Sequence, residues 1–338
     1  LNQHCSASGL RCRSSFPAQR VSMIQSSNTP RVVIIGAGAM GSLFGFLLHR
    51  AGKDVWLLDK DESLAEQVRR HGLVVEAADG IHHCSLPITT QSADIGWGDL
   101  IVLSVKAYDT AQAAAAAKPL LRESSIILTV QNGIGNIENI VTVIDKKHIM
   151  AGITAQGATV LSPGRIRHAG TGETIVGELD GRITERLNQI RLFLDSAGIA
   201  VETTDDVVGL LWSKLLINAA INPLTGITGL QNGALLAHVE CCEIMYRTVQ
   251  EGQALAVRQG IRLIYPDAFA KATSVCAATA ENISSMLQDL RNHKRTEIDF
   301  INGAIVQKGS ELGVPTPVNA GLFHLVRIRE AIAGHCSP

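Results

Sequence analysis

The sequence predicts an α/β protein in which a doubly wound sheet precedes an all-helical second half. Short runs of β-branched and aliphatic residues alternate with helical patterns over residues 31–130, as in a parallel sheet with crossover helices. Strand-like segments follow between residues 148 and 177. Beyond a polar break at 203–206 the alternation stops and the pattern is mainly helical. We therefore expect one domain over residues 31–204 and a helical domain over 205–334.

Each element of the first domain is predicted from its local pattern. Uninterrupted apolar runs such as Arg31-Val32-Val33-Ile34-Ile35 are typical of strands that are buried on both faces. The predicted strands cover residues 31–35, 54–58, 73–76, 81–86, 99–105, 126–130 and 199–202. The predicted helices cover residues 42–50, 61–70, 110–121 and 183–197.

A glycine-rich turn joins the first predicted strand to the first predicted helix. It reads Gly36-Ala37-Gly38-Ala39-Met40-Gly41, and Asp59 ends the next strand 23 residues after Gly36. A GxGxxG with a strand before it, a helix after it and this acid is a dinucleotide-binding pattern. The glycines permit the tight turn and let backbone N–H groups approach a pyrophosphate at the helix N-terminus. The first domain is therefore predicted to be Rossmann-type, with Gly36, Gly38, Ala39, Met40 and Gly41 at the cofactor.

Lys106 and Asn132 directly follow two strands that are expected to be neighbours in the sheet. The carboxyl ends of such strands are where doubly wound sheets bind ligands. A solvated surface lysine and an Asn-Gly turn are the alternative interpretations, and the sequence leaves them open.

The second half contains an apolar helix that carries a polar stripe. In the segment 211–225, Lys214, Asn218 and Asn222 are spaced i, i+4, i+8 and so share one helical face. The other positions are mostly Leu, Ile and Ala, and Pro223 is expected to end the helix. A lysine and two amides on such a helix cost desolvation energy unless they are paired. A bound polar substrate is one candidate partner.

Further helices are predicted over residues 237–259 and 267–280. After them Asn282, Ser285 and Asp289 fall at i, i+3, i+7, which predicts a second polar stripe. Glu297 is expected to open a helix that ends near residue 311. Taken singly, these residues fit helix caps and first-turn positions.

Composition excludes several classes of partner. Residues 1–30 contain three arginines and no acid, so the rest of the chain carries 27 Lys and Arg against 31 Asp and Glu, a net charge of −4. No basic field for nucleic acid is therefore expected. The uncharged run 32–48 approaches membrane-span length, but its four glycines and its strand-turn-helix pattern explain it better. A small-molecule partner is expected, with no nucleic acid and no membrane.

The cysteines and the N-terminal tail indicate in which cellular compartment the protein is expected. The seven cysteines form no CxxC pair, so reduced thiols in a cytoplasmic protein and no metal site are expected. The tail 1–30 is Ser-rich, Arg-bearing and acid-free, as organellar transit peptides are. The alternative is an upstream extension before a start at Met23. Either way we treat 1–30 as a disordered or non-native extension outside the fold.

The chain resembles the ketopantoate reductase (2-dehydropantoate 2-reductase) family from about residue 31 to about residue 330. The resemblance is carried by the stretches GAGAMG, SVKAYDT around Lys106, QNGIGN around Asn132, WSKLLINAAINPLT and SSMLQDLRNHKRTEIDFING. The last two are more specific than the dinucleotide pattern, which many oxidoreductases share. The resemblance implies a substrate enclosed between a Rossmann domain and a helical domain, and it leaves a homodimer open.

The resemblance also implies roles for single residues. Lys214 looks like the general acid, and Glu297 like its acidic counterpart, which would hold Lys214 or a substrate hydroxyl. Lys106 and Asn132 look like groups on the nicotinamide side of the cofactor. The groups that look like holders of the substrate hydroxyl and carboxylate are Asn218, Asn222, Asn282 and Ser285. Chemically, a lysine can supply both the charge and the proton that ketone reduction requires.

The family resemblance and the local residues predict different cofactors. The family usually takes NADPH and places a basic residue after the second strand, where Lys60 lies. The neighbouring Asp59 is instead the residue type that binds the ribose hydroxyl of NADH. We expect NADPH with Lys60 on its 2′-phosphate, and NAD stays open because of Asp59.

The main prediction is NADPH-dependent reduction of 2-dehydropantoate to (R)-pantoate, a step toward pantothenate and coenzyme A. The first alternative is a paralogue on the same scaffold that reduces another 2-oxo acid. Two-domain dehydrogenases of β-hydroxy acids or glycerol phosphate would lack the NPLT and TEIDFING stretches. A non-catalytic dinucleotide-binding sensor would have lost the proton donor or its partner, but Lys214 and Glu297 are both present.

Overall fold

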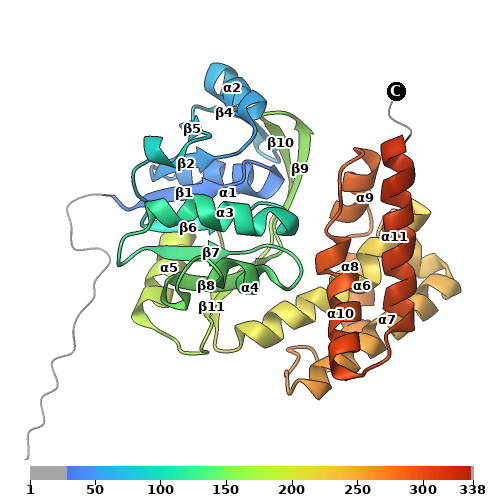
Figure 1. The fold of residues 1–338 in the computed structure, drawn as a ribbon. Helices are drawn as coiled ribbons and strands as arrows, with labels where there is room; N and C mark the ends of the chain where they lie inside the picture. Colours follow the sequence, from blue (N-terminus) through green and yellow to red (C-terminus); the bar gives the residue numbers. More distant parts are fainter. Residues whose placement is uncertain (1–28, 336–338) are drawn as a thin grey trace, which may run out of the picture.

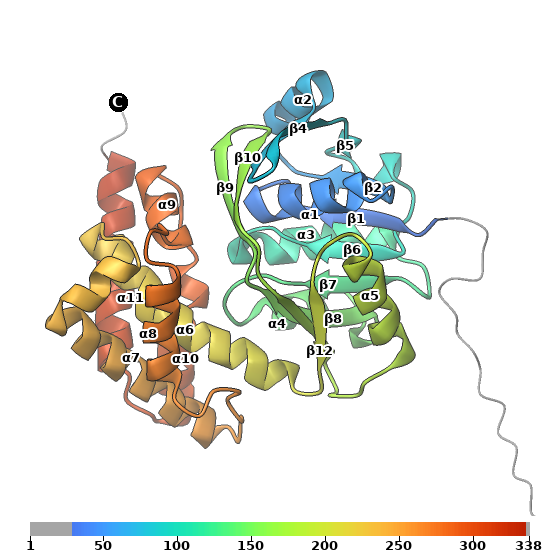
Figure 2. The ribbon, with the colours of Figure 1, turned by 180° about the vertical axis from the view of Figure 1, so that it is seen from behind.

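The structure is a computed structural model that describes residues 29–335. An α/β N-terminal domain is followed by an all-helical region, and the two halves lie side by side (Figures 1 and 2). This arrangement confirms the predicted fold class. The expectation for the extension 1–30 falls almost entirely outside the described residues.

The centre of the N-terminal domain is an eight-stranded sheet with the order β12-β11-β8-β7-β6-β1-β2-β5. Every neighbouring pair is parallel except β8 with β11. Its strands are β1 (Arg31–Ile35), β2 (Asp54–Leu58), β5 (Ile88–Thr89), β6 (Leu100–Leu103), β7 (Ile126–Thr129), β8 (Ile149–Thr154), β11 (Thr174–Glu178) and β12 (Val201–Thr204).

Helices cover both faces of this sheet. They are α1 (Ala39–Arg50), α2 (Glu62–His71), α3 (Thr110–Ala117), α4 (Asn136–Val141) and α5 (Glu185–Asp195). Alternate residues of β1 point to opposite faces: Val32 and Ile34 belong to the core that includes α1 and α5, and Val33 and Ile35 to the core that includes α3. This two-sided burial explains why the strand is apolar at almost every position.

A second, four-stranded sheet has the order β4-β3-β10-β9. It consists of β3 (Leu73–Ala77), β4 (Gly80–Cys84), β9 (Gly157–Ser162) and β10 (Arg165–Gly170). In both views the β9–β10 hairpin lies on the side of the domain that faces the helical region. Residues of this hairpin line a cavity between the two halves: Gly157, Ala158, Thr159, Arg167 and Ala169.

The helical region is built around α6 (Val207–Thr228), which begins three residues after β12 ends. It also contains α7 (Val239–Arg258), α8 (Ala268–Ala278), α9 (Ser285–Arg291), α10 (Asn302–Leu312) and α11 (Pro317–His335), with short 3₁₀ turns η5 (Gly233–Ala237) and η6 (Ile298–Phe300). Helix α6 is long and apolar enough to cross a membrane, but 78% of its apolar window is buried inside the protein. Such burial is typical of a core helix.

Pro223 lies inside α6, so the prediction that it ends the helix is wrong. The helix continues to Thr228 and ends where Gly229 adopts a φ of +76°. Because proline has no N–H, the carbonyl of Ala219 lacks its usual donor four residues later. The side-chain amide of Asn302 donates to that carbonyl at 3.1 Å. A contact from α10 thus replaces the missing helical bond.

Two predicted helix starts are also wrong. Helix α9 begins at Ser285, with Ser284 capping it, so Asn282 precedes the helix and shares no helical stripe with Asp289. Glu297 likewise precedes η6, and α10 begins only at residue 302. The physical reason for the second error is that the Glu297 carboxylate accepts a hydrogen bond from the other half of the protein.

Candidate active site

A cavity of about 860 Å³ lies between the N-terminal domain and the helical region, with residues of both halves in its walls. All the predicted site residues line it except Gly41. They are Gly36, Gly38, Ala39, Met40, Asp59, Lys60, Lys106, Asn132, Lys214, Asn218, Asn222, Asn282, Ser285 and Glu297. The tertiary structure therefore brings together groups that the sequence separates by more than two hundred residues.

The three glycines of the turn have different geometric roles. Gly36 has a φ of +100°, and a Cβ there would lie 2.8 Å from the backbone nitrogen of Val105. A Cβ on Gly38 would meet nothing within 4 Å, which leaves open space beside the N-terminus of α1. A Cβ on Gly41 would lie 1.9 Å from the carbonyl oxygen of Gly36. Gly41 therefore permits close packing of helix and turn, and its place at the cofactor stays a prediction.

Asp59 and Lys60 lie at the end of β2. The Asp59 carboxylate accepts hydrogen bonds from the backbone N–H groups of Ala37, at 2.6 Å, and Asp61, at 3.0 Å. The Asp59 carboxylate therefore holds the glycine-rich turn against the end of β2. Lys60 Nζ lies 2.7 Å from a carboxylate oxygen of Asp109, and its side chain is 58% exposed. That exposure leaves the ammonium group free to exchange partners.

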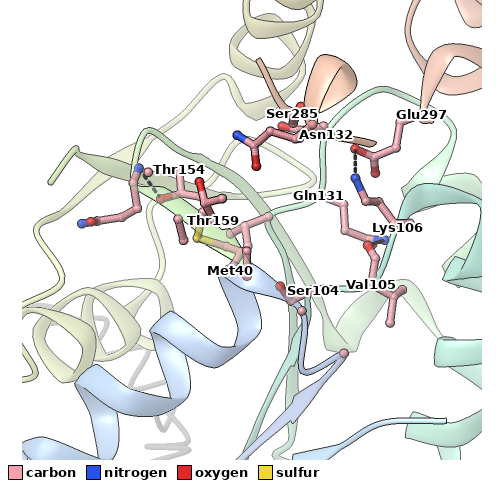
Figure 3. Close-up of a pocket in the computed structure, with 18 of the residues that line it drawn as sticks. Met40, Ser104, Val105, Lys106, Gln131, Asn132, Thr154, Thr159, Ser285 and Glu297 are labelled. Carbon is pink, nitrogen blue, oxygen red and sulfur yellow. Dashed lines mark hydrogen bonds and ion pairs between the residues drawn. The ribbon is translucent and has the colours of Figure 1, made fainter. Parts of the chain in front are cut away.

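The predicted placement of Lys106 and Asn132 is confirmed, because β6 and β7 pair in parallel and both residues follow them at one edge of the sheet. Gln131, which the sequence did not single out, fixes this edge. Its side-chain amide donates to the carbonyl of Val105 and to the hydroxyl of Thr110, both at 2.9 Å. Two loops from neighbouring strands are thereby joined beside the cavity (Figure 3).

Lys106 extends from the N-terminal domain to two carboxylates of the helical region. Its Nζ lies 2.5 Å from Asp289 Oδ2 and 4.0 Å from Glu297 Oε2, and Figure 3 shows Lys106 and Glu297 pointing toward each other. Burial lowers the pKa of Lys106, but the Glu297 and Asp289 carboxylates outweigh burial and raise it above its ordinary value. Lys106 is therefore a persistent cation.

Glu297 is fixed by the N-terminal domain rather than by Lys214. Its Oε1 accepts a hydrogen bond of 3.0 Å from the backbone N–H of Ala107, and only 6% of the residue is exposed. Its charge still reaches Lys214, whose pKa it raises in opposition to burial. Glu297 thus influences Lys214 through its charge and makes no direct contact with it, and the substrate hydroxyl stays its other predicted partner.

Lys214 projects from the second turn of α6 to the N-terminal domain. Its Nζ donates to the carbonyl oxygen of Thr154, at the end of β8, at 3.0 Å. Burial lowers its pKa from the ordinary lysine range to about 8. A group with this pKa holds a proton at neutral pH and can release it readily. No sequence signal indicates Thr154, because its contribution is a backbone carbonyl.

Asn218 and Asn222 occupy the next two turns of α6 on the same side as Lys214, and all three line the cavity as the spacing predicted. Asn282 lies in the loop before α9, and Ser285 is the first residue of that helix. These amide and hydroxyl groups can bind a carboxylate or a hydroxyl of a small substrate. With Lys214 and the glycine-rich turn, they give one cavity the parts needed for hydride and proton transfer.

Known proteins resemble this chain over most of its length. The family model of ketopantoate reductase PanE/ApbA matches residues 32–181, and the model of its C-terminal part matches residues 206–330. The chain is 38% identical to a 2-dehydropantoate 2-reductase of Archaeoglobus fulgidus, over 88% of this chain and 97% of that protein. It is 35% identical to the corresponding protein of Pyrococcus horikoshii, over 90% and 99%.

Solved structures show the same architecture. A PanE/ApbA family ketopantoate reductase from Ralstonia eutropha aligns with a TM-score of 0.82 at 33% identity, covering 90% of this chain and all of that chain. A D-mandelate dehydrogenase bound to NADH and anilino(oxo)acetate aligns with a TM-score of 0.86 at 29% identity, covering 90% and 99%. Fold, cavity and relatives therefore lead to one conclusion: the chain belongs to the ketopantoate reductase PanE/ApbA family and is an oxidoreductase.

Proposed function

We propose that the protein reduces 2-dehydropantoate to (R)-pantoate with NADPH, a step toward pantothenate and coenzyme A. The observation that carries the proposal is the position of Lys214, a lysine with a pKa of about 8 in the same cavity as the glycine-rich turn. The relatives named 2-dehydropantoate 2-reductase support the choice of substrate.

The residues present fit a dinucleotide. The open space at Gly38, beside the N-terminus of α1, gives a pyrophosphate access to backbone N–H groups. When bound, the nicotinamide supplies the hydride. Lys106 and Asn132, at the sheet edge, flank the nicotinamide side in this proposal. The carboxyl ends of β6 and β7 are where a doubly wound sheet binds such a ligand.

Lys214 then supplies the proton. As negative charge develops on the keto oxygen, the ammonium group stabilises it and transfers its proton there. The Thr154 carbonyl holds Nζ at the boundary between the two halves, which fixes where the keto oxygen must lie. Asn218, Asn222, Asn282 and Ser285 bind the carboxylate and hydroxyl of the substrate. Glu297, fixed by Ala107, places a negative charge near the ammonium or the substrate hydroxyl.

The likeness to D-mandelate dehydrogenase favours one second candidate, a reductase of another 2-oxo acid. The two are separated by NADPH oxidation with ketopantoate, phenylglyoxylate, 2-oxoisovalerate and pyruvate at equal concentrations. We expect the highest kcat/KM with ketopantoate, because its carboxylate and hydroxyl both find polar partners in the cavity. Turnover of another acid without turnover of ketopantoate would refute the proposed substrate and leave the oxidoreductase assignment in place.

The proposed preference for NADPH depends on Lys60. In this proposal its ammonium group leaves Asp109 and binds the 2′-phosphate. Asp59 meanwhile keeps its structural bonds to the glycine-rich turn. We expect Lys60→Met to lower kcat/KM with NADPH by about 10–100-fold, since a hydrogen bond to a charged group contributes about 1.5–3 kcal/mol. With NADH as the cofactor, kcat/KM of the same variant should differ from the wild-type value by about threefold at most.

The matched control is Lys53→Met, which removes a lysine of the same domain outside the cavity. It should leave the ratio of the two kcat/KM values unchanged. If wild-type protein prefers NADH, or if Lys60→Met loses activity equally with both cofactors, the assignment of Lys60 to the 2′-phosphate is wrong.

A further inference from the structure

Asp289 is a buried carboxylate for which the proposed mechanism has no use. It lies on α9, does not line the cavity, and is only 8% exposed. Its partner is Lys106, which comes from the other half of the protein 183 residues away along the chain. Burying a carboxylate costs free energy, and a single short ion pair returns only part of that cost. This pair therefore calls for an explanation beyond stability.

Two carboxylates compete for Lys106. Asp289 is the nearer, at 2.5 Å, whereas the second oxygen of Glu297 stays 4.0 Å away because Ala107 holds the first. Two further titratable groups act on the pair through their charge: Tyr108 on Lys106 and Lys294 on Asp289. Asp289 therefore makes the direct ion pair with Lys106, while Glu297 acts on the same ammonium group through its charge from a greater distance.

This arrangement controls the charge that acts on Lys214. Glu297 acts through its charge on both Lys106 and Lys214, and Asp289 adds a second negative charge that balances Lys106. Without Asp289, the Lys106 cation would be balanced by Glu297 alone. The surroundings of Lys214 would then become more positive, and its ammonium form less favourable.

We propose that Asp289 is a positioning residue that acts through Lys106: it neutralises that lysine across the interface of the two halves and thereby reserves Glu297 for Lys214 and the substrate. The inference rests on the proposed function in which Lys214 is the proton donor. It gives a role to a residue of the SSMLQDLRNHKRTEIDFING stretch that has no place in the cavity wall.

The test measures the titration of Lys214 directly in the full-length, cofactor-free protein. Carbamylation by cyanate is followed from pH 6 to 10, and the Lys214 peptide is quantified by mass spectrometry with exposed Lys118 as internal reference. We expect Asp289→Asn to move the Lys214 midpoint down by about 0.5–1 pH unit, as one uncompensated charge would at an effective dielectric constant near 20. Lys106→Met should move it up by a similar amount.

The double variant Lys106→Met/Asp289→Asn decides between this account and a merely structural role. It removes both members of the pair, so the midpoint should return to within about 0.3 pH unit of the wild-type value. Asp289→Glu keeps the charge and should also stay near wild type. Asp299→Asn is the control, because it breaks the Arg295–Asp299 ion pair, which lies at 2.8 Å and is screened by solvent.

An unchanged or raised midpoint in Asp289→Asn overturns the proposal, as does a double variant that keeps the full downward shift. If Asp289→Asn does not fold, the Lys106→Met variant decides the matter: an upward shift supports the proposal, and a downward shift or none overturns it. Because labelling needs no turnover, failure of ketopantoate as a substrate would refute the proposed function and still leave this result readable.

Discussion

Lys214→Ala is expected to lower kcat for ketopantoate reduction by about 10²–10⁴-fold, the range for loss of a general acid. The variant lacks both the proton and the positive charge that face the developing oxyanion, while the glycine-rich turn and the amides of the cavity stay in place. KM for NADPH should therefore change by about threefold at most. The measurement is steady-state kinetics of NADPH oxidation, with the thermal midpoint recorded for each variant.

The pH dependence of the wild-type protein gives an independent check. Lys214 must be protonated to act, and its pKa lies at about 8. We expect kcat/KM for reduction to be level below pH 7 and to fall about tenfold for each pH unit well above pH 8. The residual activity of Lys214→Ala should not show this fall of kcat/KM at high pH. Near-wild-type kcat in the variant, or a fall that persists in it, would remove Lys214 from the mechanism.

Asn302→Ala is expected to lower the free energy of unfolding by about 2–5 kcal/mol. Asn302 is fully buried and donates to the Ala219 carbonyl at 3.1 Å and to Asn319 Oδ1 at 2.9 Å. Each buried acceptor left without a donor costs about 1–3 kcal/mol. Within the described part of the chain, Asn302 Oδ1 has no partner of its own, so its removal offsets a little of the loss. Urea unfolding measures the change.

Pro223→Ala supplies the matched test of this explanation. An alanine at this position brings back the N–H that can donate to the Ala219 carbonyl within α6. In the Asn302→Ala background it should recover about 1–2 kcal/mol, whereas in the wild-type background its effect should be smaller. Equal effects in the two backgrounds would show that Asn302 and Pro223 do not share the Ala219 carbonyl.

Local sequence patterns fail where a side chain bonds to a distant part of the chain. The local pattern predicts that Glu297 opens its own helix, but its carboxylate binds the Ala107 N–H 190 residues away. Local propensity favours Glu297 at the start of a helix, but the hydrogen bond to the distant backbone decides where its carboxylate lies. Such a partner cannot be found from the spacing of neighbouring residues.

The pattern of apolar and polar residues along the chain is enough to predict most of the elements and the side chains that share a face. Apolar runs predicted the strands, and their ends placed Lys106 and Asn132 at one sheet edge. The helical spacing placed Lys214, Asn218 and Asn222 on one side of α6, and the structure finds all three in the cavity wall. These inferences succeed because the periods of strands and helices decide which side chains share a face.

The partners of those faces become visible only in the folded protein. The carbonyl of Thr154 that holds Lys214, the Asp289 carboxylate that neutralises Lys106 and the Asn302 amide that carries α6 past Pro223 all come from distant segments. Periodicity contains no information about partners across the interface, because hydrogen bonds and ion pairs depend on where two chain segments come to lie in space. The chemistry of this site therefore depends on contacts that only folding creates.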